Sequence, residues 1–233
     1  MFDFKPESFR IHGDLFRPLV ALGIPMSLQS AAITVSMLYV NSWVNTYGVV
    51  ASAVSGIGHK VEQVNNTIVN AFSTAGGSMV AQCIGAKKYD RVSRVMLTAL
   101  AITSILSCIF IFCTVCWPRT VFGIFTTDIA VLDMAITYVP IAVISFVGSA
   151  LRPAMFSLIN GSGNSRLNLV VAILDGIIAR IGLGLLLGLV FEMGVYGFWY
   201  GNALAGLVPF FIGTTYYFSG HWKKRNETIP KNE

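Results

Sequence analysis

A glutamate and a histidine stand three residues apart inside a long apolar stretch of this sequence. His59 and Glu62 belong to GIGHKVEQVNN (56–66), and the surrounding stretch, 49–84, is mostly Ala, Val, Ile, Gly and Ser. On a helix, residues three apart can touch, whereas Lys60, two residues from Glu62, cannot share its face. A carboxylate beside an imidazole can bind a proton or a cation, or it can compensate a positively charged ligand.

The carboxylate belongs to a longer polar stripe on the predicted helix. Residues within about 60° of one line along that helix, counted at about 100° per residue, are His59, Glu62, Gln63, Asn66, Asn70, Ser73 and Gly77. The preceding segment has a similar polar side, formed by Ser27, Ser30, Thr34, Asn41 and Asn45, with Gln29 nearer its other end. We therefore expect two neighbouring helices, joined at Gly48, that each present a polar face.

The composition indicates that lipid is the main solvent of these helices. Of 233 residues, 55% are hydrophobic and 12% are charged, whereas a soluble domain carries about 25% charged residues. Apolar runs of about 20 residues are typical of membrane-spanning helices. Six such segments occur, at about 18–47, 50–84, 95–117, 129–159, 167–191 and 195–218. The sequence predicts an all-α, polytopic membrane protein with a bundle of six transmembrane helices.

The depth of Glu62 restricts where its side chain can point. It lies twelve residues after Val50, which is roughly 18 Å along a helix and near mid-membrane. A charge there costs about 2.5–3.5 kcal/mol on insertion scales, so the stripe should face other helices or a water-filled cavity. A buried network that only joins helices is one interpretation. The carboxylate beside a histidine favours the other, a functional cavity.

Asp175 and Arg180, in the fifth segment, are the second candidates for such a cavity. They are five residues apart, which is about 140° around an α-helix, so we do not expect them to pair well with each other. An ion pair to a neighbouring helix and a role in transport both remain open for each residue.

The distribution of basic residues predicts the orientation of the chain. With both termini inside, twelve of the sixteen Lys and Arg residues are cytoplasmic, Arg119 alone lies outside, and Lys60, Arg152 and Arg180 fall within the spans. This bias follows the positive-inside rule and requires an even number of crossings. We expect a cytoplasmic segment (1–17), a six-helix membrane lobe (18–220) and a cytoplasmic tail (221–233), located in the cell membrane.

Other classes of protein have little support in the sequence. The patterns GxSxG, HExxH and the P-loop do not occur, so we expect a protein that is not an enzyme. The net charge of +5 fits basic loops better than nucleic-acid binding, for which none of the usual motifs appears. Cys113 and Cys116 form a CxxC within an apolar run, where a metal site would need further ligands.

Several segments resemble the second half of a multidrug and toxic compound extrusion (MATE) transporter. They are IPMSLQSAAITVSMLYVNSWVNTYG, AQCIGAKKYDRV, FGIFTTD, INGSGNSR and YYFSGHWKK, in the expected order and over nearly the whole chain. AQCIGAKKYDRV and INGSGNSR are the most specific. The sequence departs from the family pattern at Asn164, where Asp is usual, and at Asn168, where Pro is usual.

The resemblance implies a secondary antiporter that exports cationic or amphiphilic compounds in exchange for Na⁺ or H⁺, without another cofactor. Such transporters have twelve helices in two six-helix lobes around a central cavity. Glu62 maps to the carboxylate position of the second helix of the second lobe, so it could bind Na⁺. We expect a partner lobe, either a separate chain or a second copy. A split gene, a truncated product, a fragment that does not transport and a flippase for lipid-linked oligosaccharides remain alternatives.

Overall fold

Long helices make up nearly all of the described chain. The structure, a computed structural model, describes residues 13–224. The elements in chain order are α1 (Gly13–Asn45), α2 (Val49–Gly85), α3 (Tyr89–Cys116), α4 (Pro118–Gly123), α5 (Ile129–Gly161), α6 (Ser165–Val171), η2 (Ala172–Ala179), α7 (Arg180–Leu185), η3 (Leu186–Val190), α8 (Val195–Ala205), α9 (Val208–Ser219) and α10 (His221–Lys224). The segments η2 and η3 are π-helical. No strand occurs in residues 13–224, so the predicted all-α class is confirmed there. Most of the predicted N-terminal segment (1–12) and of the tail (225–233) lies outside the described residues.

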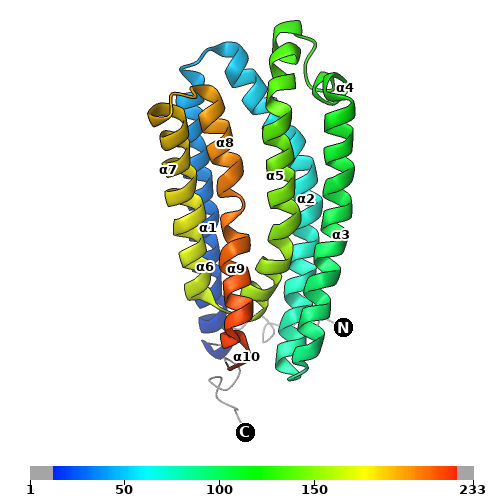
Figure 1. The fold of residues 1–233 in the computed structure, drawn as a ribbon. Coiled ribbons are helices and arrows are strands. Elements are labelled where there is room, and N and C mark those ends of the chain that lie inside the picture. Colours follow the sequence, from blue (N-terminus) through cyan, green and yellow to red (C-terminus); the bar gives the residue numbers. More distant parts are fainter. Residues whose placement is uncertain (1–12, 225–233) are drawn as a thin grey trace, which may run out of the picture.

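Five of the six predicted spans are apolar helices. The helices in the described part of the chain that are long and apolar enough to cross a membrane are Gly23–Asn45, Tyr89–Cys116, Ile129–Gly161, Ser165–Val190 and Val195–Ser219. The remaining predicted span is α2, which has 37 residues but is not among these five. Its polar stripe lowers its mean hydropathy, yet α2 runs alongside α3 and α5 (Figure 1). By its position, α2 is the sixth long helix of the bundle.

The sixth predicted span is present as Val195–Ser219, but its helix is interrupted in the middle. The sequence predicted one continuous span at 195–218, whereas α8 ends at Ala205 and α9 begins at Val208. Pro209 accounts for the interruption, because it has no N–H to donate to the carbonyl of Ala205, one turn earlier. Gly206 lies in this break.

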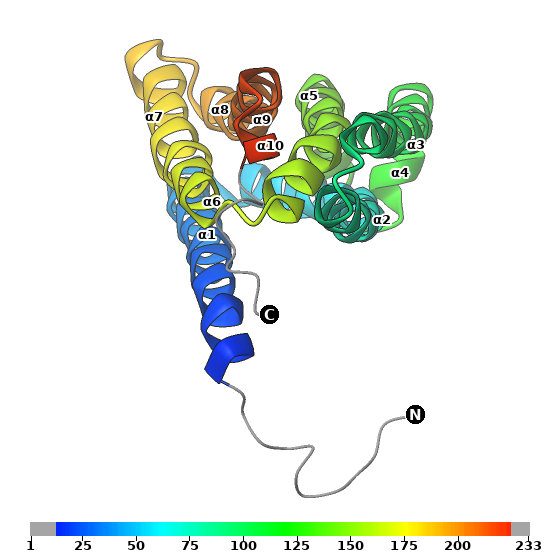
Figure 2. The ribbon, with the colours of Figure 1, turned by 90° about the horizontal axis from the view of Figure 1, so that it is seen from below.

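The long helices form two groups of three. One group contains α2, α3 and α5, and the other contains α1, the α6-to-η3 segment and α8; seen along the bundle, the groups lie side by side (Figure 2). Helix α5 contacts α8 and α9 and so connects the groups. A core that includes Val54, Tyr138, Phe146, Phe198 and Trp199 extends across both groups. Large apolar side chains are also exposed on each long helix, as expected for helices surrounded by lipid.

The connections between the helices lie at the two ends of the bundle. The beginning of α1, the α2–α3 and α5–α6 connections and α10 lie at one end, and the α1–α2 turn, α4 and the η3–α8 turn lie at the other (Figure 1). Gly48 forms the α1–α2 turn with φ of 106°, a conformation that glycine adopts without a steric penalty. Helix α4 lies between the third and fourth predicted segments.

Candidate functional site

A polar cleft lies between the two groups of helices. Its volume is about 200 Å³. The lining residues come from α1, α2, α5, α7, α8 and the α8–α9 break, and they are Ile33, Met37, Glu62, Gln63, Asn66, Asn70, Ser145, Ser149, Arg152, Arg180, Asn202, Ala203 and Gly206. Four of the long helical segments thus contribute a polar side chain to one space inside the membrane-spanning bundle.

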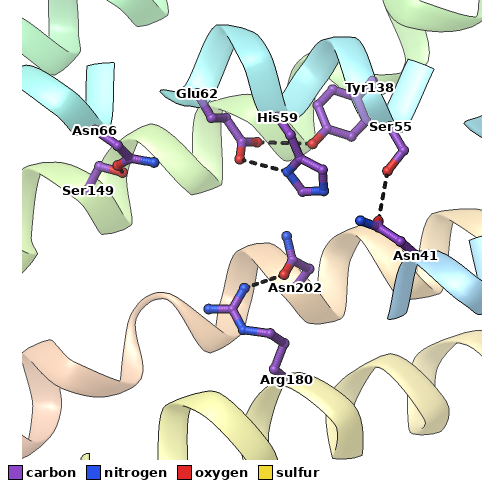
Figure 3. A network of polar contacts seen from close by, with 9 residues as sticks. All are labelled: Asn41, Ser55, His59, Glu62, Asn66, Tyr138, Ser149, Arg180 and Asn202. Carbon is purple, nitrogen blue, oxygen red and sulfur yellow. Dashed lines mark hydrogen bonds and ion pairs between the residues drawn. The ribbon is translucent and has the colours of Figure 1, made fainter. Parts of the chain in front are cut away.

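Glu62 is held in position on the α2 wall of this cleft. The hydroxyl of Tyr138, on α5, donates a hydrogen bond to Glu62 Oε1 at 3.0 Å. His59 Nδ1 lies 3.6 Å from Glu62 Oε2, so the contact expected from their spacing is present (Figure 3). The residue is 8% exposed and lines the cleft. The carboxylate is therefore held by one hydrogen bond, has His59 beside it, and is still reachable from the cleft.

Packing around Tyr138 explains why its hydroxyl reaches Glu62. The Tyr138 ring is 1% exposed, and the ring of Trp199 packs edge-on against it at a centroid distance of 5.1 Å. Gly58, one turn before Glu62 on α2, faces the ring so closely that a Cβ there would collide with it. The absent side chain of Gly58 thus lets α5 approach α2 at the level of the carboxylate.

Arg180 occupies the opposite wall and is paired with Asp175. Arg180 Nη2 lies 3.3 Å from Asp175 Oδ1, and the two residues are 5% and 1% exposed. Arg180 Nη1 also donates a hydrogen bond to Asn202 Oδ1 on α8 (Figure 3). The sequence prediction that Asp175 and Arg180 are poor partners was wrong. Residues 172–179 are π-helical, and the wider π turn brings residues i and i+5 to the same side.

The structure brings together only part of the predicted site. Glu62, Asn66, Asn70 and Arg180 line the cleft. His59 contacts Glu62, and Asp175 lies behind Arg180 without lining the cleft.

The remaining predicted residues do not line the cleft. Asn41 and Asn45 instead accept hydrogen bonds from Ser55 (3.5 Å) and Ser52 (2.8 Å) of α2, so they join the ends of α1 and α2. Gln29 is buried, whereas Ser30, Thr34 and Lys60 are exposed. Lys60 Nζ lies 6.0 Å from the centre of the Phe125 ring, beside the α4–α5 connection.

The sequence analysis placed Gln63 in the polar stripe and Arg152 within a span without assigning either to the site, and it did not name other lining or supporting residues. These are Tyr138, Ser145, Ser149 and Asn202. Two signals were present in the sequence. Ser145, Ser149 and Arg152 recur at intervals of four and three on one segment, and Asn202 is an amide within an otherwise apolar and aromatic stretch.

Comparisons with known proteins agree with this architecture. The family model described as MatE matches residues 25–186, more than half of the chain. The chain is 23% identical over 210 residues to "Probable multidrug resistance protein YoeA" of Bacillus subtilis, a match that covers 90% of this chain and 45% of that protein. It is 25% identical to "Multidrug and toxin extrusion protein 1" of Rattus norvegicus, over 75% of this chain and 32% of that protein.

The fold also matches solved structures over half of their length. A structure described as "Crystal structure of MATE in the straight conformation" superposes with a TM-score of 0.85 at 16% identity, covering 97% of this chain and 51% of that chain. The chain therefore spans about half, or less, of the proteins it resembles. It has the fold of one MATE lobe, and on the match to the family model it belongs to the MatE family.

Proposed function

We propose that this chain is the second lobe of a secondary antiporter that exports cationic and amphiphilic compounds in exchange for Na⁺ or H⁺. The observation that supports this function is the cleft with Glu62 in its wall, reachable at mid-bundle, hydrogen-bonded to Tyr138 and beside His59. The names of the relatives, which refer to multidrug resistance and toxin extrusion, agree with this substrate class.

Glu62 provides the exchange in this proposal. A cationic substrate in the cleft compensates its charge, and a proton or Na⁺ compensates the charge when the substrate has left. Because Glu62 carries a single negative charge, it attracts a cationic substrate less strongly once a proton or Na⁺ is bound. Binding of the ion therefore favours release of the substrate. Around Glu62, the amide of Asn66 and the hydroxyl of Ser149 line the cleft and offer further oxygen atoms.

A second six-helix lobe completes the transporter in this proposal, either as a separate chain or as a second copy. The cleft of this lobe would then form one half of a passage between two bundles in the cell membrane, with both termini in the cytoplasm. Polar residues of the stripe that are exposed on this lobe, such as Gln63 and Asn70, would border that passage instead of lipid.

Replacing Glu62 tests the function. Cells that express the chain with its partner lobe are loaded with a fluorescent cationic dye, and efflux is followed with time. We expect Glu62→Gln to reduce the rate of efflux at least about tenfold, because the neutral amide cannot compensate a cation. Glu192→Gln is the matched control, since Glu192 is exposed in the η3–α8 turn outside the cleft.

Efflux by Glu62→Gln at the rate of the unsubstituted protein would exclude Glu62 as the exchange site. If the unsubstituted chain and its partner lobe exported no cationic dye, the proposed substrate class itself would be wrong.

A further inference from the structure

Arg152 lies in the wall of the same cleft and has no ionic partner there. It follows Ser145 and Ser149 on one face of α5, and all three line the cleft. Within residues 13–224, the Arg152 guanidinium forms no hydrogen bond or ion pair, and its Nε is buried without a partner. An arginine within a membrane span is costly unless it meets an opposite charge or water. The other charged groups of the cleft, in contrast, have partners.

The partners of those groups leave Arg152 as the uncompensated charge. Asp175 neutralises Arg180 from behind the wall. Glu62 is engaged by Tyr138 and His59 on the α2 side. Asp175 does not line the cleft, so Glu62 is the one carboxylate that faces Arg152 and Arg180 across it, among the described residues.

Amide groups add further hydrogen-bond donors to the cleft. Asn202 Oδ1 accepts from Arg180, and Asn66 Oδ1 accepts from Ser149 at 2.7 Å. The amide nitrogen of each asparagine therefore points away from these bonds (Figure 3) and has no protein acceptor in the described part of the chain. A group with negatively charged oxygen atoms would find donors from α2, α5 and α8 in this space.

The break between α8 and α9 makes room for the Arg152 side chain. A Cβ added to Gly206 would stand 3.2 Å from Arg152 Nη2, which is closer than such contacts usually are. Gly206 thus allows the guanidinium to lie at the interrupted helix, beside the cleft.

Building on the proposed function, we propose that Arg152 and Asn202 form an anion-binding subsite, and that the substrates of this cleft include zwitterions. A carboxylate of the substrate binds Arg152 and the amide nitrogen of Asn202, and the cationic group of the same molecule faces Glu62. In this arrangement one molecule brings a negative group to Arg152 and a positive group to Glu62, which a simple cation cannot do.

Two dyes that differ by one carboxylate test this proposal. Rhodamine B is zwitterionic, and its ethyl ester is a cation of nearly the same shape. The full chain is purified from membranes in the assembly that it forms there, placed in lipid nanodiscs, and titrated with each dye by fluorescence polarisation. We expect Arg152→Gln to raise the Kd for rhodamine B by about tenfold, the effect of losing one charged hydrogen-bonding partner.

The ester provides the internal control for folding. Arg152→Gln should bind the ester as well as the unsubstituted protein does, or more tightly, because a like charge is removed. Arg152→Lys should keep part of the affinity for rhodamine B, since it keeps the charge but loses the planar fork. Arg166→Gln, at an exposed position outside the cleft, should change neither Kd.

Three outcomes separate the hypotheses. An equal loss of both dyes in Arg152→Gln, or no change in either, would overturn the anion subsite while leaving the proposed export of cations intact. If Arg152→Gln weakened the association of this lobe with its partner lobe and affected both dyes alike, Arg152 would bind a carboxylate of the partner lobe. That outcome also overturns the anion subsite. Failure of the unsubstituted protein to bind the ester would contradict the proposed function itself.

Discussion

Asp175 and Arg180 illustrate how strongly burial determines what one ion pair contributes to stability. Their atoms lie 3.3 Å apart with side chains that are 1% and 6% exposed. Arg119 and Asp133 form a closer pair at 2.5 Å, but with side chains that are 64% and 55% exposed. Exposed pairs contribute little because water screens them, whereas removing one partner of a buried pair leaves an uncompensated charge.

These two pairs give a matched prediction for stability. We expect Asp175→Asn to lower the free energy of unfolding by about 3 kcal/mol, because Arg180 would stay buried without its carboxylate. Asp133→Asn, the same substitution at the exposed pair, should cost less than about 1 kcal/mol. Unfolding in mixed micelles, followed by circular dichroism, measures both. Equal losses would show that the Asp175–Arg180 pair is not what stabilises the α7 wall of the cleft.

At the same scale, sequence reasoning succeeded where α-helical geometry holds, and it failed for a pair on a π-helical turn and for a pair distant in sequence. The contact of His59 with Glu62 could be predicted because three residues on an α-helix fix the geometry. The pairing of Asp175 with Arg180 could not, because it depends on a π-helical turn for which the sequence has no simple signature. Tyr138 is separated from Glu62 by 76 residues, and their contact depends on how α5 is rotated against α2.

Close packing of α2 on α5 is what positions the Glu62 carboxylate. A Cβ at Gly58 would collide with the Tyr138 ring, while a Cβ at Gly56, two residues earlier, would meet nothing within 4 Å. These two glycines share one helix but face different surroundings. Alanine substitutions at the two positions therefore separate the effect of helix packing from the effect of helix propensity.

We expect Gly58→Ala to push Tyr138 away from Glu62 and to slow dye efflux, with a loss of about 1–3 kcal/mol in stability from overpacking. Gly56→Ala should leave efflux unchanged and should stabilise α2 by up to about 1 kcal/mol, since alanine favours helix over glycine. Efflux assays in cells and thermal unfolding in detergent check both variants. Normal efflux in Gly58→Ala would mean that the Tyr138 hydrogen bond is dispensable for transport.

Helix boundaries were more predictable than the faces that the helices bury. In the structure, helices end at the turn residues of the sequence, which are Gly48, 160–166 and 192–194. Asn164, where the family usually has Asp, still caps α6 by accepting a hydrogen bond from the Leu167 N–H at 3.2 Å. The polar face of α1, in contrast, was assigned to the cavity, although Asn41 and Asn45 bind serines of α2.

The whole bundle is arranged as two groups of three helices with the cleft between them. The cleft has polar walls from both groups, whereas two pockets elsewhere on the described residues are almost entirely apolar. One of these lies between α2, α3 and the α4 region and is lined by Val61, Phe110 and Phe125, among others. Polar groups at bilayer depth are thus gathered where they face one another, as expected where lipid is the alternative solvent.

The orientation of the whole bundle in the membrane is a prediction from its basic residues that labelling can test. The α2–α3 connection, with Lys87 and Lys88, lies at the end that also holds the α5–α6 connection and α10, and the α4–α5 connection lies at the opposite end (Figure 1). The positive-inside rule predicts that the basic end faces the cytoplasm. Variants with a single cysteine can report on the two ends. The four native cysteines, Cys83, Cys108, Cys113 and Cys116, are first replaced by serine. Lys88→Cys and Thr127→Cys then each introduce one cysteine at an exposed position, one at each end of the bundle. We expect a membrane-impermeant maleimide to label the Thr127→Cys protein in intact cells and the Lys88→Cys protein only after permeabilisation. The reverse pattern would contradict the orientation expected from the basic residues, in which both termini lie in the cytoplasm.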